Sequence, residues 1–187
     1  MAEREIRETL LATRVLQEAC GRHRRYAFNP DVIYSDPSLI KVISFDLAGR
    51  LMNSRIAVVA GSGISGAIFA VSVAADLSIL NQRKVRSAIA NKVDGTFGWR
   101  RGHGELVADQ NVAVVDDETV TGDTLRGVIR TVRSARGRMI AAAVIGNCGG
   151  VTAEMIGCPI FTLVSLDLES CDESECPLCR EQALAIA

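Results

Sequence analysis

The sequence lacks an excess of charge of either sign. Its 187 residues include 21 Lys or Arg and 22 Asp or Glu, which gives a formal net charge of −1 at pH 7. A nearly neutral chain produces no global field that would attract nucleic acid or an anionic membrane. Any anion site must therefore be local, and neither nucleic acid nor a membrane is expected as a partner.

Segments that direct proteins into or across a membrane are also missing. No apolar run reaches the length that spans a bilayer, and the opening MAERE is too charged to begin a signal peptide. The sequence therefore predicts a cytoplasmic protein. It shows no internal repeat, linker or second domain, and its 48% apolar and 23% charged residues are typical of one globular domain.

The six cysteines indicate free thiols or metal ligands before disulfides in such a protein. Cys171, Cys176 and Cys179 form a C-x4-C-x2-C cluster whose last pair has zinc-ligand spacing. A tetrahedral site needs a fourth ligand, which Cys148 or Cys158 could supply only if the fold brought one of them close. A reduced, partly buried tail is the simpler interpretation, and no metal ligand is predicted.

The most informative stretch begins with four small apolar residues at 112–115, a pattern typical of a strand buried on both faces. Asp116 and Asp117 follow, then a hydroxyl-rich loop, and Thr124 opens a helix that Gly137 can end. The helix places apolar residues on one face: Leu125, Val128, Ile129, Val132 and Ala135. A helix N-terminus can hold a phosphate, and carboxylates at a strand end can accept hydrogen bonds from sugar hydroxyls. The stretch therefore suits a ribose 5-phosphate, although an ordinary strand-turn-helix with an acidic N-cap has the same composition.

A glycine loop at 61–66 follows a predicted strand at 56–60 and precedes a predicted helix at 67–75. Its G-x-G-x-x-G pattern also occurs in dinucleotide sites, which need an acidic residue about 20 positions on. Here a predicted strand at 77–80 is followed by Asn81-Gln82-Arg83-Lys84, so that residue is absent. The loop serves equally well as a nest of backbone N–H groups for pyrophosphate, with Arg83 and Lys84 neutralising the same anion.

The remaining segments complete an alternating pattern. The spacing of apolar residues predicts an amphipathic helix over residues 4–20. Residues 21–30 form a basic and aromatic turn, which either binds a flat anionic ligand or is simply exposed. Residues 85–104 are either a functional lid or an unrecognised hairpin. Asp36-Pro37 opens another helix. Strands are expected at 139–145 and 160–165, and short helices at 151–157 and 179–186. Such alternation predicts an α/β fold with a mostly parallel sheet flanked by helices, and ligands at the carboxyl ends of its strands.

The stretch from Asp116 to Thr124 resembles the PRPP-binding motif of type I phosphoribosyltransferases. Asp116, Asp117, Thr121, Gly122 and Thr124 match that motif, whereas Glu118, Val120 and Asp123 depart from it. With the glycine loop, the basic pair Arg83-Lys84, the segment from Gly21 to Asn29 and the ending Cys176-Pro177-Leu178-Cys179, nearly the whole chain resembles the orotate phosphoribosyltransferases.

This resemblance implies transfer of ribose 5-phosphate from PRPP to a base, with Mg²⁺ held mainly by substrate oxygens and water. It implies a core at about 36–157, a hood from about 1–35 and 158–187, and a homodimer. The implied ribose and 5-phosphate residues are Asp116, Asp117, Thr119, Val120, Thr121, Gly122, Asp123 and Thr124, and the implied pyrophosphate residues are Gly61, Ser62, Gly63, Ile64, Arg83 and Lys84. The implied base-binding residues are Arg22, Arg24, Arg25, Tyr26, Phe28 and Asn147.

Three departures from the family concern the base and the mobile loop. The loop's usual Lys and His are missing, so Arg86, Lys92 or His103 is expected to act there beside the catalytic Asp116 and Asp117. Asn147 stands where an Arg usually holds the orotate carboxylate. Arg24 and Arg25 replace smaller residues of the base segment, and either of them could compensate for the missing Arg. The sequence thus favours orotate as the base; a different heterocyclic base, or a PRPP- or nucleotide-sensing regulator without turnover, stays open.

Overall fold

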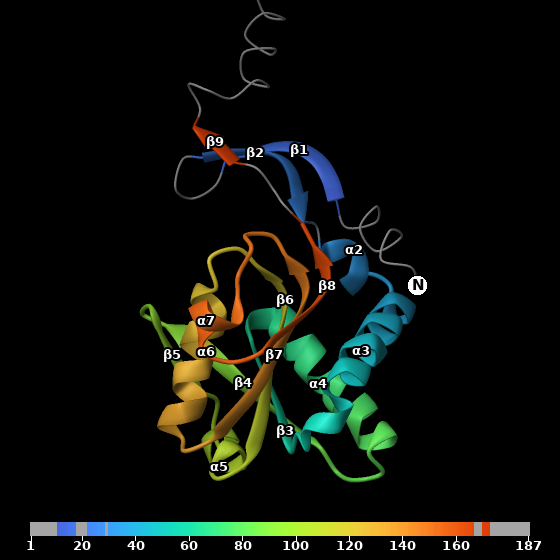
Figure 1. The fold of residues 1–187 in the computed structure, drawn as a ribbon, viewed down its shortest axis with the longest axis vertical. Coiled ribbons are helices and arrows are strands. Elements are labelled where there is room, and N and C mark those ends of the chain that lie inside the picture. Colours follow the sequence, from blue (N-terminus) through green and yellow to red (C-terminus); the bar gives the residue numbers. More distant parts are fainter. Residues whose placement is uncertain (1–10, 18–21, 29, 167–169, 173–187) are drawn as a thin grey trace, which may run out of the picture.

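A computed structural model of the chain describes residues 11–17, 22–28, 30–166 and 170–172. It has two sheets, a large one of six strands and a small one of three that lies beyond one end of the large sheet (Figure 1). The large sheet carries the core, and the small sheet forms the hood.

The large sheet has the strand order β5-β4-β3-β6-β7-β8. Its strands are β3 (Val58–Ser62), β4 (Arg86–Val93), β5 (Thr96–Trp99), β6 (Asn111–Thr119), β7 (Arg138–Asn147) and β8 (Ile160–Ser165). All neighbours pair in parallel except β5, which is antiparallel to β4. The order reverses between β3 and β6, where a crevice forms outside the strand ends. The predicted type I phosphoribosyltransferase-like α/β fold is confirmed.

Helices cover both faces of this sheet because its inner strands alternate between two apolar clusters. Along β6, Ala113 and Val115 pack with α3 (Pro37–Leu51) and α4 (Gly63–Leu80), while Val112 and Val114 pack with α6 (Asp123–Ser134). The short α5 (His103–Val107) and α7 (Ala153–Ile156) complete the second face. A 3-10 turn, η1 (Met52–Ser54), follows α3.

The hood joins the two ends of the chain. Strand β2 (Arg22–Phe28) pairs antiparallel with β1 (Leu11–Gln17) on one side and with β9 (Ser170–Asp172) on the other. The helix predicted over residues 4–20 is therefore wrong for the part described, because cross-strand pairing with β2 prevails over the helical spacing of its apolar residues. The short helix α2 (Asp31–Tyr34) leads from the hood to α3. Strand β8 belongs to the large sheet, so the C-terminal contribution to the hood begins after it.

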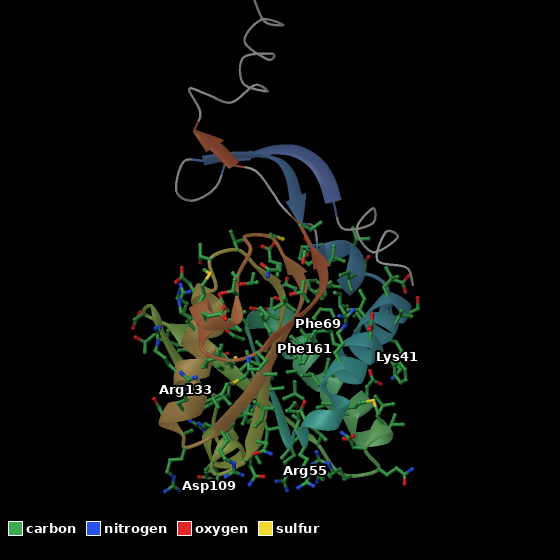
Figure 2. The ribbon with its side chains drawn as sticks, in the orientation of Figure 1. Lys41, Arg55, Phe69, Asp109, Arg133 and Phe161 are labelled. Carbon is green, nitrogen blue, oxygen red and sulfur yellow. The ribbon has the colours of Figure 1, made fainter. Side chains whose placement is uncertain are left out.

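Helix α4 continues to Leu80, and the strand predicted at 77–80 is wrong. The helix is apolar because one side packs on the sheet and the other on α3, and Phe69 and Val73 are fully buried. Figure 2 labels Phe69. Its length and composition alone would also suit a membrane span, contrary to our expectation that no run reaches that length. Its contacts with α3, β3, β4 and β6 place it against the sheet and the neighbouring helix.

The segment 85–104 is a hairpin of β4 and β5 rather than an irregular loop. It is docked on α6: the Trp99 Nε1–H donates to the Thr131 carbonyl oxygen over 3.3 Å, and the Thr131 hydroxyl donates to the Phe97 carbonyl oxygen over 3.2 Å. The Phe97 ring covers Gly127, where an added Cβ would come within 2.3 Å of the ring. This packing explains why the segment showed no periodicity of its own.

Two cysteines of the described core, Cys148 and Cys158, are buried, and the Cys148 thiol donates to Glu118 Oε2 over 3.9 Å. Burial raises the pKa of the Cys158 thiol, which is the behaviour of a structural rather than a reactive cysteine. The backbone of Cys171 lies in β9, but Cys176, Cys179 and the helix predicted at 179–186 lie outside the described residues. The zinc alternative stays a prediction.

Candidate active site

A cavity of about 380 Å³ opens at the carboxyl ends of β3 and β6, where the strand order reverses. In Figure 1 these strand ends face the hood. The cavity is lined by two groups of residues that the sequence separates widely: Ser62, Gly63, Ser65, Lys92 and Phe97, and the continuous run from Asp116 to Thr124. The predicted convergence of the acidic motif and the glycine loop is thus present.

The acidic pair stands at the end of β6. Asp116 is buried, and its Oδ1 accepts a hydrogen bond of 3.2 Å from the Asp117 backbone N–H. Burial, reinforced by the charge of Asp117, raises the pKa of the Asp116 carboxyl well above its ordinary range. Two adjacent carboxylates in a confined site cannot both be ionised at low cost. They are therefore suited to bind a group that donates hydrogen bonds or develops positive charge.

Asp117 has a partner that the sequence did not reveal. The Tyr34 hydroxyl, at the end of α2, donates a 2.8 Å hydrogen bond to Asp117 Oδ2. The two residues are 83 positions apart, and α2 is only four residues long. No spacing rule predicts such a contact, which exists only because α2 is packed beside the end of β6.

The loop between β6 and α6 is hydrogen-bonded to itself. Gly122 has a left-handed φ of 79° and caps α6, and the Thr121 hydroxyl donates to Asp123 Oδ2 over 2.7 Å. Asp123 Oδ1 accepts from Arg126 Nη2, also at 2.7 Å. These two hydrogen bonds lower the pKa of Asp123, so this carboxylate is ionised at the mouth of the loop. Thr119 and Val120 complete the lining and connect β6 to the loop.

The turn between β3 and α4 is held by its main chain. A Cβ added to Gly61 would lie 1.9 Å from the Gly66 carbonyl oxygen, so only glycine fits there. Ser62 and Gly63 face the cavity, and Gly63 has a left-handed φ of 69°. Of the predicted pyrophosphate residues in this turn, Ile64 is 80% exposed and does not line the cavity.

Lys92 is the cation that the described cavity wall contributes. It lies near the carboxyl end of β4, and its Nζ is 5.6 Å from the centre of the Phe97 ring on β5. The sequence indicates Lys92 only as a candidate of the mobile loop and assigns the pyrophosphate to Arg83 and Lys84, because it predicts the neighbouring strand at 77–80. Had α4 been continued to Leu80, the next strand would have begun near Val85, and Lys92 would have been the basic residue at its end.

The predicted cations Arg83, Lys84 and Arg86 lie on the wrong side of the sheet for this cavity. Arg83 Nη2 donates to the Ile56 carbonyl oxygen just before β3, and Arg86 opens β4. Figure 2 shows Arg55, which directly precedes Ile56, at the edge of the molecule farthest from the hood. Their proposed contact with pyrophosphate, and a catalytic role for Arg86, are therefore corrected.

His103 is engaged in structure. It begins α5, and its Nδ1 accepts a 2.8 Å hydrogen bond from the Ile89 backbone N–H at the point where β5 no longer covers the edge of β4. It does not line the cavity. Because the His103 side chain is bound to β4 and lies outside the cavity lining, the expectation that it replaces a catalytic loop residue is corrected.

Asn147, predicted to contact the base, closes a turn. Its Oδ1 accepts from the Val151 N–H at 2.9 Å and its Nδ2 donates to the Val151 carbonyl oxygen at 2.8 Å. The side chain is buried, and it is absent from the cavity lining. The other predicted base-binding residues, Arg22, Arg24, Arg25, Tyr26 and Phe28, lie on β2 of the hood, and their side chains lie outside the described part of the chain.

Comparison with known proteins agrees with this geometry. No family model matches the chain. It is 33% identical over 161 residues to the orotate phosphoribosyltransferase of Caldicellulosiruptor bescii, a match that covers 86% of this chain and 80% of that protein.

Among solved structures, the orotate phosphoribosyltransferase of Mycobacterium tuberculosis superposes with a TM-score of 0.71 at 16% identity, over 88% of this chain and 94% of that one. A second structure of that enzyme, in complex with PRPP, has a TM-score of 0.61 at 16% identity over 74% and 80% of the two chains. An adenine phosphoribosyltransferase from Thermoanaerobacter pseudethanolicus has a TM-score of 0.66 at 15% identity, covering 88% and 100%.

The structural neighbours share the fold, and the relative from C. bescii exceeds 30% identity over most of both chains. The chain belongs to the orotate phosphoribosyltransferase family and has the type I phosphoribosyltransferase fold.

Proposed function

We infer that this protein transfers the ribose 5-phosphate group of PRPP to orotate, giving orotidine 5′-phosphate and pyrophosphate, a step of pyrimidine biosynthesis. The observation that carries this inference is the single cavity at the switch point, which brings together an acid pair, a helix N-terminus and a glycine turn. The names of the relatives and the PRPP complex of a structural neighbour support the same reaction.

Each part of the cavity has a task in this reaction. The carboxylates of Asp116 and Asp117 accept hydrogen bonds from the two ribose hydroxyls and stabilise the positive charge that develops on the sugar as the C1–O bond to pyrophosphate breaks. The backbone N–H groups and hydroxyls of residues 121–124 receive the 5-phosphate. Ser62, Gly63 and Lys92 face the leaving pyrophosphate, whose charge Lys92 helps to neutralise.

We propose that Mg²⁺ enters with PRPP. No cluster of three or more His, Cys, Asp or Glu suited to a metal ion occurs in the described ranges, so the metal would take its ligands mainly from pyrophosphate and ribose oxygens and water. The acidic lining suits such a hydrated cation, because Asp116, Asp117, Glu118 and Asp123 can accept hydrogen bonds from its water ligands. The bound ion would supply the positive charge that a polyanionic substrate needs in so acidic a cavity.

The acidic lining of the cavity also supports a second candidate function, in which ribose 5-phosphate is transferred to a heterocyclic base other than orotate. Asn147 is bound to Val151, and Glu118 lines the cavity as a further carboxylate. A carboxylated base such as orotate would therefore need cationic residues of the hood to bind its carboxylate. The sequence offers Arg22, Arg24 and Arg25 for this task. A base without a carboxylate would not need them.

We further propose a homodimer in the cytoplasm. Exposed apolar side chains on the outer faces of α3 and α4, namely Val42, Phe45, Val71 and Ile79, support self-association. Sedimentation velocity tests this directly, because a chain that stays at 20.0 kDa at micromolar concentration would exclude it.

The deciding experiment mixes the purified protein with PRPP, Mg²⁺ and a panel of bases and measures pyrophosphate release. Release with orotate alone supports the proposed reaction. Release with another base keeps the chemistry and replaces the substrate. PRPP binding without release with any base would make the protein a sensor with the enzyme's fold.

A further inference from the structure

Tyr34 is the described residue outside the cavity lining that contacts the acid pair through a side-chain hydrogen bond. Both its backbone and its ring are held in place. The backbone N–H of Tyr34 donates to the Pro30 carbonyl oxygen at 3.2 Å, and the ring packs against Phe69 with a centroid distance of 6.2 Å and an interplanar angle of 52°. Ile33, the preceding residue, is fully buried and anchors α2 in the core. These contacts fix the position of the Tyr34 hydroxyl beside the Asp117 carboxylate.

We infer that Tyr34 is a positioning residue of the reaction: its hydroxyl holds the Asp117 carboxylate in the orientation that receives the ribose hydroxyls of PRPP. The inference rests on the proposed function. A carboxylate with one oxygen held by a donor at 2.8 Å cannot rotate freely, so its plane is set before the substrate arrives. Such pre-orientation of a charged group contributes to catalysis because no reorganisation is needed as the transition state forms.

The protonation state of the phenol suits this role. Burial, followed by the negative charge of Asp117, raises the pKa of the Tyr34 hydroxyl far above its ordinary value. The phenol therefore stays protonated, and its O–H donates to Asp117 Oδ2. The contact is a fixed hydrogen bond and does not act as an acid or a base.

The phenol lies where the two halves of the cavity meet. Ser65, in the first turn of α4, is close enough to it to offset part of the rise in its pKa. Ser65 lines the cavity beside Ser62 and Gly63, whereas Asp117 belongs to the ribose side. Tyr34 therefore stands between the turn that faces pyrophosphate and the carboxylate that faces the sugar.

The test is Tyr34→Phe, which keeps the ring against Phe69 and removes only the hydroxyl. We expect kcat/KM for PRPP to fall about 10- to 100-fold, the range found when the partner of a site ligand is removed. Most of the loss should appear as a higher KM for PRPP, because a misoriented Asp117 receives the ribose hydroxyls of the bound substrate less well. The thermal unfolding temperature should change by only a few degrees.

A double-mutant cycle with Asp117→Asn separates positioning from general support of the fold. In the Asp117→Asn background, Tyr34→Phe should cause no further loss of kcat/KM. Equal losses in both backgrounds, or an unchanged kcat/KM and KM for PRPP in the single variant, would overturn the inference. Ser35→Ala is the matched control: it removes an exposed hydroxyl of the adjacent residue that bonds only to the Val32 carbonyl oxygen, and it should leave activity unchanged.

Calorimetric titration with PRPP and Mg²⁺ distinguishes failure of this inference from failure of the proposed function. If the wild type binds PRPP but releases no pyrophosphate with any base, the function fails, and Tyr34 is judged by whether Tyr34→Phe weakens PRPP binding at least tenfold. If the wild type turns over and the variant matches it, the inference fails alone. If the wild type does not bind PRPP, both are overturned.

Discussion

The two turns that face each other across the cavity are built in opposite ways. The turn between β3 and α4 has no charged side chain and is held by main-chain contact, with Gly61 packed directly on the Gly66 carbonyl. The loop between β6 and α6 is held by side chains, through the Thr121, Asp123 and Arg126 hydrogen bonds, and carries the acid pair at its start. The first turn has no room to change shape, whereas the second can exchange its internal hydrogen bonds for bonds to a ligand.

This difference separates stability from binding. Substitutions in the first turn should act through folding, because they displace backbone. Substitutions in the second should act on ligand affinity and turnover, because its side chains are exposed to the cavity and the core beneath it is unaffected. The following predictions test that division.

Asp116→Asn should cause the largest effect, a fall in turnover of about 100- to 1,000-fold through loss of charge stabilisation. Stability should change in the opposite direction. Because burial raises the pKa of Asp116 in the folded state, the folded protein loses stability as pH rises from the ordinary carboxyl range through that raised pKa. A neutral Asn avoids this loss, so the free energy of unfolding at pH 7 should rise by about 1 kcal/mol. Urea denaturation at several pH values measures it; a gain independent of pH would contradict the explanation.

Gly61→Ala should destabilise the protein by about 3 kcal/mol or prevent its folding, because the new methyl group would overlap the Gly66 carbonyl oxygen. Gly49→Ala is the matched control. Gly49 lies within α3 with no atom within 4 Å of an added Cβ, so alanine should stabilise the helix by about 0.5–1 kcal/mol. Thermal and urea unfolding report both. Normal stability of Gly61→Ala with weakened PRPP binding would reverse the roles assigned to the two turns.

Lys92→Ala should raise the KM for PRPP about tenfold, since it removes the described cationic side chain of the cavity wall and its charge-assisted contacts. Arg86→Ala removes a cation from the other end of the same strand and should leave KM unchanged. Steady-state kinetics of the two variants compare cations at the two ends of β4 directly. A larger effect from Arg86 would restore the sequence-based assignment.

Asp123→Asn should have the smallest effect, a few-fold increase in affinity for PRPP that diminishes at high salt, because it removes a carboxylate beside the phosphate loop. Asp109→Asn alters an equally exposed acid, paired with Arg136 far from the cavity, and should leave affinity unchanged. Calorimetry at two ionic strengths separates these outcomes. Weaker binding by Asp123→Asn would show that the carboxylate organises the loop for phosphate.

The acidic loop and its helix were predictable because a buried strand and an amphipathic helix give strong, different periods. Leu125, Val128, Ile129 and Val132 are all buried as the helical spacing requires. The convergence of this loop with the glycine turn also followed from the alternation of strands and helices, since parallel strands end at one edge.

The errors have a common origin in apolar segments without a clear period. Residues 77–80 are apolar in sequence and read equally well as a strand or as the end of a helix. A strand predicted there shifts the expected position of the next strand. The cations assigned to pyrophosphate then become Arg83 and Lys84 in place of Lys92. The contact between Tyr34 and Asp117, and the docking of Phe97 on Gly127, are set by tertiary packing and leave no local pattern.

The pairing of β3 with β6 has a consequence for how the protein folds. Val58 pairs with Val112, and the whole of α4, β4, β5 and α5 lies between them in the chain. Closing so long a loop costs entropy before any contact is gained, so we expect this central pairing to form after the local contacts. The two halves of the PRPP site meet only after it. Ligand binding will therefore select the completely folded chain, and PRPP should suppress hydrogen exchange most strongly in β3 and β6.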